Sequence, residues 1–112
     1  MSTEQVKVAR VSDVPKRYNE LNPHEKGYIN KHYSAVIDII RRSESGTVNS
    51  SGLYEKFDGE GSLGRHSLGR TLSALAAMNY VVRDETWDKW DIGRLDDSQW
   101  EDLEEALGEV VD

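Results

Sequence analysis

Residues 62–84 read SLGRHSLGRTLSALAAMNYVVRD, and the architecture of the whole chain follows from this stretch. Leu68, Leu72 and Leu75 recur at helical spacing, and with a rotation of about 100° per residue they lie within about 40° of one direction. This spacing predicts a helix with one buried leucine stripe. We expect the helix to begin at Ser62 or Leu63 and to end at Met78.

Strand-like residues follow this helix. Asn79 can end the helix in the left-handed conformation. Tyr80–Arg83 and Lys89–Ile92 flank a polar turn, which predicts a β-hairpin. We expect Trp87 and Trp90 to pack the hairpin onto the body of the protein, in preference to stacking on a ligand.

Two further helices precede the leucine stripe. Asn22, Pro23 and Glu25 match a capping box with proline at the first helical position. We therefore expect a helix over about residues 23–43, followed by a short extended link and a second helix over roughly residues 50–57. The candidate caps of that second helix are Asn49, Ser50 and Ser51.

The last segment predicts an acidic amphipathic helix that begins after a cap at Asp97 or Ser98. Its apolar residues form one stripe, which needs a partner. We expect this stripe to form a dimer interface, with packing inside the same chain as the alternative. The stripe consists of Trp100, Leu103, Leu107 and Val110.

The order of elements is helix, short strand, helix, helix, hairpin, helix. This order predicts a mainly α fold with a small β-hairpin, namely a winged helix-turn-helix with a C-terminal dimerisation helix. We expect residues 1–22 to form a partly ordered N-terminal extension. Residues 23–95 are expected to form the winged helix-turn-helix, and residues 96–112 the dimerisation helix.

The composition excludes several classes of protein. The chain has 112 residues, a formal net charge of −7 and no cysteine. This length suits one domain, and the absence of cysteine excludes disulfides, cysteine zinc sites and thiol catalysis. No apolar run is long enough to span a membrane, and the N-terminus lacks a signal-peptide pattern. We therefore expect a cytoplasmic protein that does not bind a membrane.

The negative charge is unevenly distributed. Residues 1–70 carry 11 basic and 9 acidic side chains, a net of +2, whereas residues 71–112 carry 3 basic and 12 acidic side chains, a net of −9. No carboxylate occurs from Ser62 to Arg83. The acidic pI near 4.9 therefore does not exclude nucleic acid, because the helix of the leucine stripe lies in an acid-free window.

The face opposite the leucine stripe is basic or small, as a helix that enters the DNA major groove requires. An ordinary solvated surface is the alternative. Gly64 and Gly69 are poor helix formers, and they favour a surface that another molecule approaches closely. The candidate DNA contacts on this helix are Arg65, His66, Ser67, Arg70 and Ser73.

Two other places offer DNA contacts. Ser50 and Ser51 begin the short helix, whose N-terminus can hold a phosphate. Arg83 and Lys89 of the hairpin can touch the DNA backbone. This hairpin is acidic for a DNA-binding wing, so both cations have to point toward DNA while its carboxylates point away.

No catalytic or metal-binding pattern stands out. His24, His32 and His66 lack the spacing of metal ligands. The chain also shows no nucleophile paired with a base and no paired carboxylates outside a solvated face. We expect no metal, no cofactor and no enzymatic activity.

The stretch LGRTLSALAAMNYVVRD, residues 68–84, resembles the third helix and first wing strand of winged helix-turn-helix transcription regulators of the PadR/MarR-like kind. The resemblance spans about residues 23–95, with a C-terminal dimer helix beyond. The acidic composition also resembles that of proteins from halophilic archaea, among them PadR-like regulators of the oxidative-stress response. The resemblance implies a dimeric DNA-binding regulator whose contacts fall on Arg65, His66, Ser67 and Arg70.

The sequence therefore predicts a sequence-specific transcription regulator that binds double-stranded DNA as a homodimer on a pseudo-palindromic site, in a stress response. We expect inorganic cations to bridge acidic side chains and phosphates, so that DNA affinity stays flat or rises with salt. The alternative is a winged-helix protein-interaction module that does not bind DNA and works through its acidic C-terminal helix.

Overall fold

The computed structural model describes residues 10–43, 47–56, 64–84, 89–93 and 95–111. Its helices are η1 (Val11–Asp13), α1 (Val14–Asn19), α2 (Pro23–Arg42), α3 (Ser50–Lys56), α4 (Arg65–Ala77) and α5 (Asp97–Val110). Its strands are β1 (Thr47–Asn49), β2 (Val82–Asp84) and β3 (Lys89–Asp91). The described part of the chain is thus mainly helical with one small antiparallel sheet, as the sequence predicted at this coarse level.

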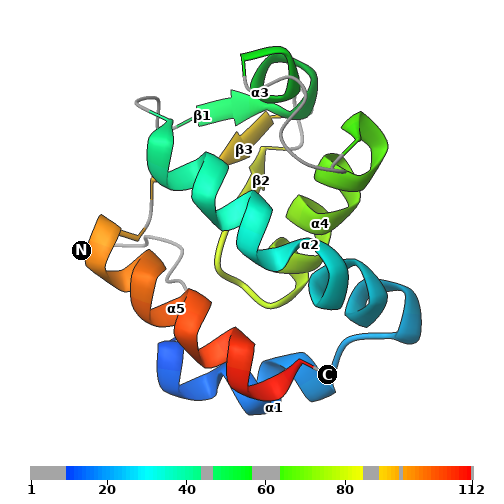
Figure 1. Ribbon diagram of the computed structural model, residues 1–112, viewed down its shortest axis with the longest axis vertical. Helices are drawn as coiled ribbons and strands as arrows, with labels where there is room; N and C mark the ends of the chain where they lie inside the picture. The colour runs from blue at the N-terminus through cyan, green and yellow to red at the C-terminus, as the bar shows by residue number, and fades with distance from the viewer. Residues whose placement is uncertain (1–9, 44–46, 57–63, 85–88, 94, 112) are drawn as a thin grey trace, which may run out of the picture.

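The long helix α2 lies between two groups of elements (Figure 1). On one side α2 packs against α4, and α4 in turn contacts α3 and β2. On the other side α2 packs against α5, which also contacts η1 and α1. None of the helices in the described ranges is both long and apolar enough to cross a membrane.

Helix α2 begins with the capping box that the sequence predicted. The Asn22 side-chain oxygen accepts a hydrogen bond from the Glu25 backbone N–H at 2.8 Å, and the Glu25 carboxylate accepts one from the Asn22 backbone N–H at 2.9 Å. Two N–H groups that lack a partner inside the helix are satisfied in this way. The apolar face of α2 enters the core, where Ile29 and Val36 are fully buried.

Helix α4 carries the leucine stripe, and Leu68, Leu72 and Leu75 are all fully buried. The helix begins at Arg65, later than the predicted start at Ser62 or Leu63. Gly64 is the N-cap and has extended backbone angles, so the helix cannot include it. Glycine is among the residues that occur at N-caps, although a Cβ at position 64 would meet no atom within 4 Å.

The junction between α4 and β2 depends on Asn79, which has a φ of 73°. The Tyr80 N–H donates to the Leu75 carbonyl at 3.0 Å, and the Asn79 N–H donates to the Ala76 carbonyl at 2.9 Å. These two bonds form a Schellman motif, which satisfies carbonyls at the end of the helix. The prediction of a left-handed stop at Asn79 is confirmed.

The sheet has three strands in the order β1-β3-β2, so β3 is central. The sequence predicted the β2–β3 hairpin but treated β1 only as a short extended link. In the structure Val48 of β1 and Arg83 of β2 both pair with Trp90 of β3. Trp90 is buried, in agreement with its expected packing role, whereas Trp87 lies outside the described residues.

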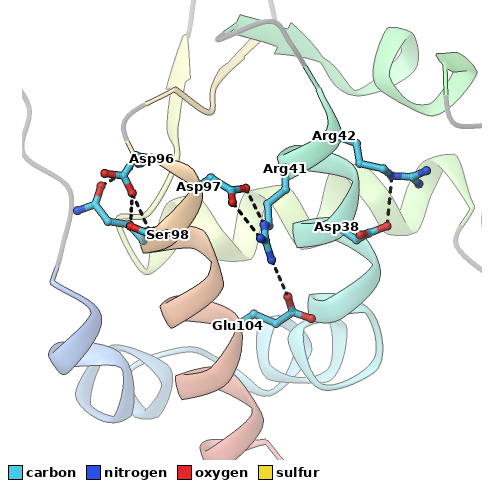
Figure 2. A network of polar contacts seen from close by, with 8 residues as sticks. Asp38, Arg41, Arg42, Asp96, Asp97, Ser98 and Glu104 are labelled. Atoms are coloured by element: carbon cyan, nitrogen blue, oxygen red, sulfur yellow. Dashed lines mark hydrogen bonds and ion pairs between the residues drawn. The ribbon is translucent and has the colours of Figure 1, made fainter.

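Helix α5 is capped one residue earlier than predicted. Asp96, not Asp97 or Ser98, accepts a hydrogen bond from the Gln99 backbone N–H at 2.8 Å, and the Gln99 side chain accepts one from the Asp96 N–H. This arrangement is a capping box, in which cap and partner are three residues apart. Asp97, in the first turn of α5, instead points toward Arg41 of α2 (Figure 2).

The apolar stripe of α5 is used inside the chain. Trp100, Leu103 and Leu107 are buried, and Val110 is half-buried against the same core. Their partners come from η1, α1 and α2, which are the elements that α5 contacts. These residues therefore pack within the chain, which is the alternative that the sequence left open to a dimer interface.

Residues 10–22, which were expected to belong to a partly ordered extension, contribute to this core. Val14, Tyr18 and Leu21 are all buried. The Tyr80 hydroxyl, at the end of α4, donates a hydrogen bond to the Arg10 carbonyl at 2.7 Å. The start of the described chain is thus bound to both groups of elements, through α5 and through Tyr80.

Candidate nucleic-acid interface

The exposed face of α4 is the main candidate surface. His66, Arg70, Ser73 and Ala77 are exposed, on the side opposite the buried leucines. This is the face that the helical spacing predicted. It offers a guanidinium, an imidazole and a hydroxyl between small side chains, and these groups can donate hydrogen bonds to phosphates and base edges.

Two local contacts order this face. The Arg70 Nε lies 3.4 Å from the His66 Nε2, one helical turn away, which is a long hydrogen bond. The buried Thr71 hydroxyl donates to the Ser67 carbonyl at 2.7 Å, so this hydroxyl has a partner within the helix. Ser67 itself is half-buried at the edge of the face, where α4 meets α2.

A cleft that the sequence did not predict lies between the first half of α2 and α4. Its volume is about 400 Å³, and its walls include His24, Tyr28, Lys31 and His32 from α2 and Ser67 from α4. Tyr28 follows His24 by four residues, and Lys31 and His32 follow Tyr28 by three and four, which places them on one side of the helix. That spacing was the available signal, but it is equally typical of a solvated helix face.

A smaller hollow of about 250 Å³ adjoins the cleft and extends it along α4. It shares His24 and Tyr28 with the cleft, and it is also lined by Glu25, Arg70 and Ser73. The carboxylate of Glu25 already accepts the backbone hydrogen bond of the capping box. The cleft is therefore continuous with the exposed face of α4 through shared aromatic and basic side chains.

Tyr28 is at the centre of this arrangement. Its ring stacks against His32 with centroids 6.4 Å apart, and it meets the edge of the His66 ring at the same distance. Partial burial and the charge of the neighbouring Lys31 lower the pKa of His32. The imidazole of His32 is thus neutral at neutral pH and becomes a cation as the solution is acidified.

The remaining candidates on the helices occupy helix starts. Ser50 and Ser51 form the first turn of α3, and Arg65 is the first residue of α4. The side chains of these three residues lie outside what the structure describes. The cap of α3 is Asn49, whose side-chain oxygen accepts a hydrogen bond from the Gly52 N–H. A Cβ at position 52 would lie 2.9 Å from that oxygen, so a larger residue there would displace the Asn49 side chain from its capping position.

The sheet places two further basic residues at the surface. Arg83 in β2 and Lys89 in β3 are both exposed, as their expected contacts with DNA require. The Arg83 guanidinium lies over the Trp90 ring, 5.5 Å from its centroid, in a cation–π contact. This contact orients Arg83 along the sheet surface and keeps its charge accessible to solvent.

Comparisons of the chain with protein-family models, with known proteins and with solved structures found no match. The resemblance to PadR/MarR-like regulators therefore remains a prediction from residues 68–84. Within the described ranges, no three histidine or carboxylate side chains gather as a metal site would require.

Proposed function

We propose that this chain is a sequence-specific DNA-binding transcription regulator of the winged helix-turn-helix type, with α4 as the helix that enters the major groove. The observation that carries the proposal is the exposed face of α4. His66, Arg70 and Ser73 lie together on it, and no carboxylate occurs between Ser62 and Arg83 to repel phosphate.

The surrounding elements support this role for α4. In helix-turn-helix proteins a short helix precedes the recognition helix, and a β-hairpin follows it in winged forms. Here α3 precedes α4 and contacts it, and β2 and β3 follow it as neighbouring strands. The leucine stripe holds α4 against the core, so its opposite face is available to a duplex.

Arg70 is the residue most suited to read a base. Its side chain is exposed in the middle of the α4 face, and arginine binds guanine O6 and N7 with two hydrogen bonds. Ser50, Ser51, Arg65, Ser67, Arg83 and Lys89 would then position the protein on the backbone. Contacts to phosphate fix the register of a protein on DNA without reading its sequence.

The regulator is proposed to act as a homodimer on a pseudo-palindromic site, because two related half-sites match a two-fold symmetric protein. Trp100, Leu103 and Leu107 are already buried within the chain. The dimer of this proposal therefore uses surfaces other than that stripe. Sedimentation velocity with and without duplex DNA measures its stoichiometry.

Titration of fluorescently labelled genomic duplexes, at several salt concentrations, tests the function. Arg70→Ala should weaken specific binding by about 1–3 kcal/mol, since it removes a two-bond base contact. Lys16→Ala is the matched control, because Lys16 is exposed on α1, a helix that packs on α5. Unchanged affinity in Arg70→Ala would remove Arg70 from the interface.

A protein-interaction module is the second candidate, and one observation favours it. The outward side of α5 exposes Glu101, Asp102, Glu105 and Glu109, which form an acidic surface suited to a basic partner. If a folded protein bound no duplex at any salt concentration, DNA binding would be excluded and α5 would become the working surface.

A further inference from the structure

All three histidines of the sequence lie around the α2–α4 cleft. His24 and His32 line it from α2, and His66 of α4 contacts the ring of Tyr28, which forms part of its wall. Lys31 adds a full positive charge. No carboxylate occurs among the described residues that line the larger hollow.

We propose that the α2–α4 cleft is a phosphate-binding site, and that it holds a DNA backbone phosphate beside the base-reading face of α4. This inference rests on the proposed function, because the source of the phosphate is the DNA that α4 reads. It adds the first half of α2 to the interface, a segment for which the sequence predicts no contact with DNA.

The chemistry of the cleft fits an anion. The Lys31 ammonium group and the Ser67 hydroxyl can donate to phosphate oxygens from opposite walls, and protonated imidazoles add charge-assisted hydrogen bonds. A cation is disfavoured, because Lys31 would repel it and the histidines do not converge as metal ligands. The cleft shares His24 and Tyr28 with the smaller hollow, which is also lined by Arg70 and Ser73 of α4. A DNA strand whose phosphate occupies the cleft would therefore continue onto α4.

Binding of a phosphate at this place takes up protons. The neighbours of His32 are Tyr28 and Lys31 on its own helix, and Ser67 faces it from α4 across the cleft. His66 and Arg70 of α4 lie beyond Tyr28, where His66 meets the edge of the Tyr28 ring and Arg70 contacts His66. The nearest carboxylate lining these hollows is Glu25, which is engaged in the α2 cap. Partial burial and the charge of Lys31 lower the pKa of His32 in the free protein, whereas a phosphate anion favours its protonated form. DNA affinity should therefore rise as the pH falls.

The first experiment measures affinity for a labelled duplex at about pH 8 and about pH 6, the range in which histidine changes charge. The wild-type protein should bind roughly five- to tenfold more tightly at the lower pH, since uptake of one proton changes affinity by up to about tenfold per pH unit. In the double variant His24→Gln/His32→Gln, the ratio of the affinity at the lower pH to that at the higher pH should fall below about twofold.

Lys16→Gln is the matched control and should keep the wild-type ratio, because Lys16 lies outside the cleft. His24 is exposed and His32 is half-buried, so both glutamines can be accommodated, and thermal melting verifies the fold. A folded double variant that retains the full pH response would overturn the proposal while leaving DNA binding by α4 intact.

The second experiment uses inorganic phosphate and requires no DNA binding. Imidazole signals of the three histidines are followed by NMR at fixed pH, with potassium chloride of equal ionic strength as the reference. Phosphate should shift the signals of His24 and His32 where chloride does not. If the protein binds no duplex, this shift assigns the cleft to free phosphate, and its absence overturns the site together with its role in DNA binding.

Discussion

Among single residues, Asn79 has the strictest conformational requirement, because its φ of 73° lies in the left-handed region. A β-branched residue is strained there, whereas glycine is not. We expect Asn79→Val to lower the free energy of unfolding by about 1–2 kcal/mol and Asn79→Gly to lower it by less. Urea unfolding followed by tryptophan fluorescence measures both.

The control for Asn79 is Ala77→Val, in the last helical position of α4, where the side chain is exposed. Valine at this site should cost only about 0.5 kcal/mol, the difference in helix propensity. If both valine variants lowered the free energy of unfolding equally, the left-handed conformation at Asn79 would not be the cause of the loss.

Which side chains of α4 face solvent could be predicted from spacing alone. The helical period separated exposed Arg70 and Ser73 from buried Leu68 and Leu72 without any knowledge of neighbouring elements. The cleft could not be predicted in this way. Tyr28 and Lys31 line a cleft only because α4, which is remote in the sequence, packs beside α2. Periodicity within one helix does not predict such a contact between helices.

At the level of secondary-structure elements, polar side chains of α2 bind α5: the Ser34 hydroxyl donates to the Glu104 carboxylate at 2.7 Å, and Arg41 makes the largest set of contacts. Arg41 donates from Nε to Asp97 at 2.8 Å and from Nη2 to the other Asp97 oxygen at 3.0 Å, and its Nη1 lies 3.9 Å from Glu104 (Figure 2). The hydrogen bond from Arg41 holds the pKa of Asp97 below its ordinary value. The pair therefore stabilises the fold only while Asp97 is ionised.

We expect Asp97→Asn to lower the melting temperature at neutral pH and to have no effect in strong acid. The stabilisation is complete above the unfolded-state pKa, about 3.9, and is lost as the pH falls through the lower folded-state value. Melting curves from about pH 7 to about pH 2 measure this difference.

Two variants control for the Asp97 effect. Asp97→Asn should change little in an Arg41→Gln background, because its partner is absent. Asp38→Asn breaks a 3.3 Å pair with Arg42 that lies within α2 and joins no second element, so its effect should be smaller. A larger effect for Asp38→Asn would contradict the fastening role of Arg41.

The buried stripe of α5 gives a second prediction for this element. Leu103 is fully buried, and Leu103→Ala should lower the free energy of unfolding by about 2–5 kcal/mol through the cavity it leaves. Glu105→Ala, two residues away and exposed, should leave it nearly unchanged. Urea unfolding at low protein concentration measures both, and normal stability combined with altered sedimentation would instead indicate an intermolecular stripe.

The elements themselves were predictable, but some of their ends and partners were not. Asp96, Asp97 and Ser98 are all good caps, and only the reciprocal bond with Gln99 selects Asp96. The pairing of β1 with β3 joins residues that are far apart in the sequence, such as Thr47 and Asp91. A three-residue strand has too short a hydrophobic pattern to predict which strand it pairs with.

For the whole molecule, the uneven charge governs how it should respond to salt. An ordinary basic protein loses DNA affinity steeply as salt rises, because binding releases counterions from the phosphates. We propose that the acidic residues in the hairpin sequence repel DNA at low salt, and that cations bound between carboxylate and phosphate relieve that repulsion. We expect the affinity for a labelled duplex to stay flat or to rise with potassium chloride concentration.

Glu85→Gln/Asp88→Asn tests the source of this behaviour, because both residues lie between β2 and β3 in the sequence. Loss of their charges should restore part of the ordinary decrease of affinity with salt. A steep decrease in the wild-type protein itself would refute the proposed role of the acidic residues.

Helix α2 belongs to both halves of this molecule at once. Its twenty residues pack on α4 along one side and receive α5 on the other. Close-packed interiors transmit strain, because interdigitated side chains leave few voids. If a ligand or a second protein displaced α5, the strain would therefore pass through α2 to α4. Helix α2 is thus the element through which a displacement of α5 would be transmitted to α4.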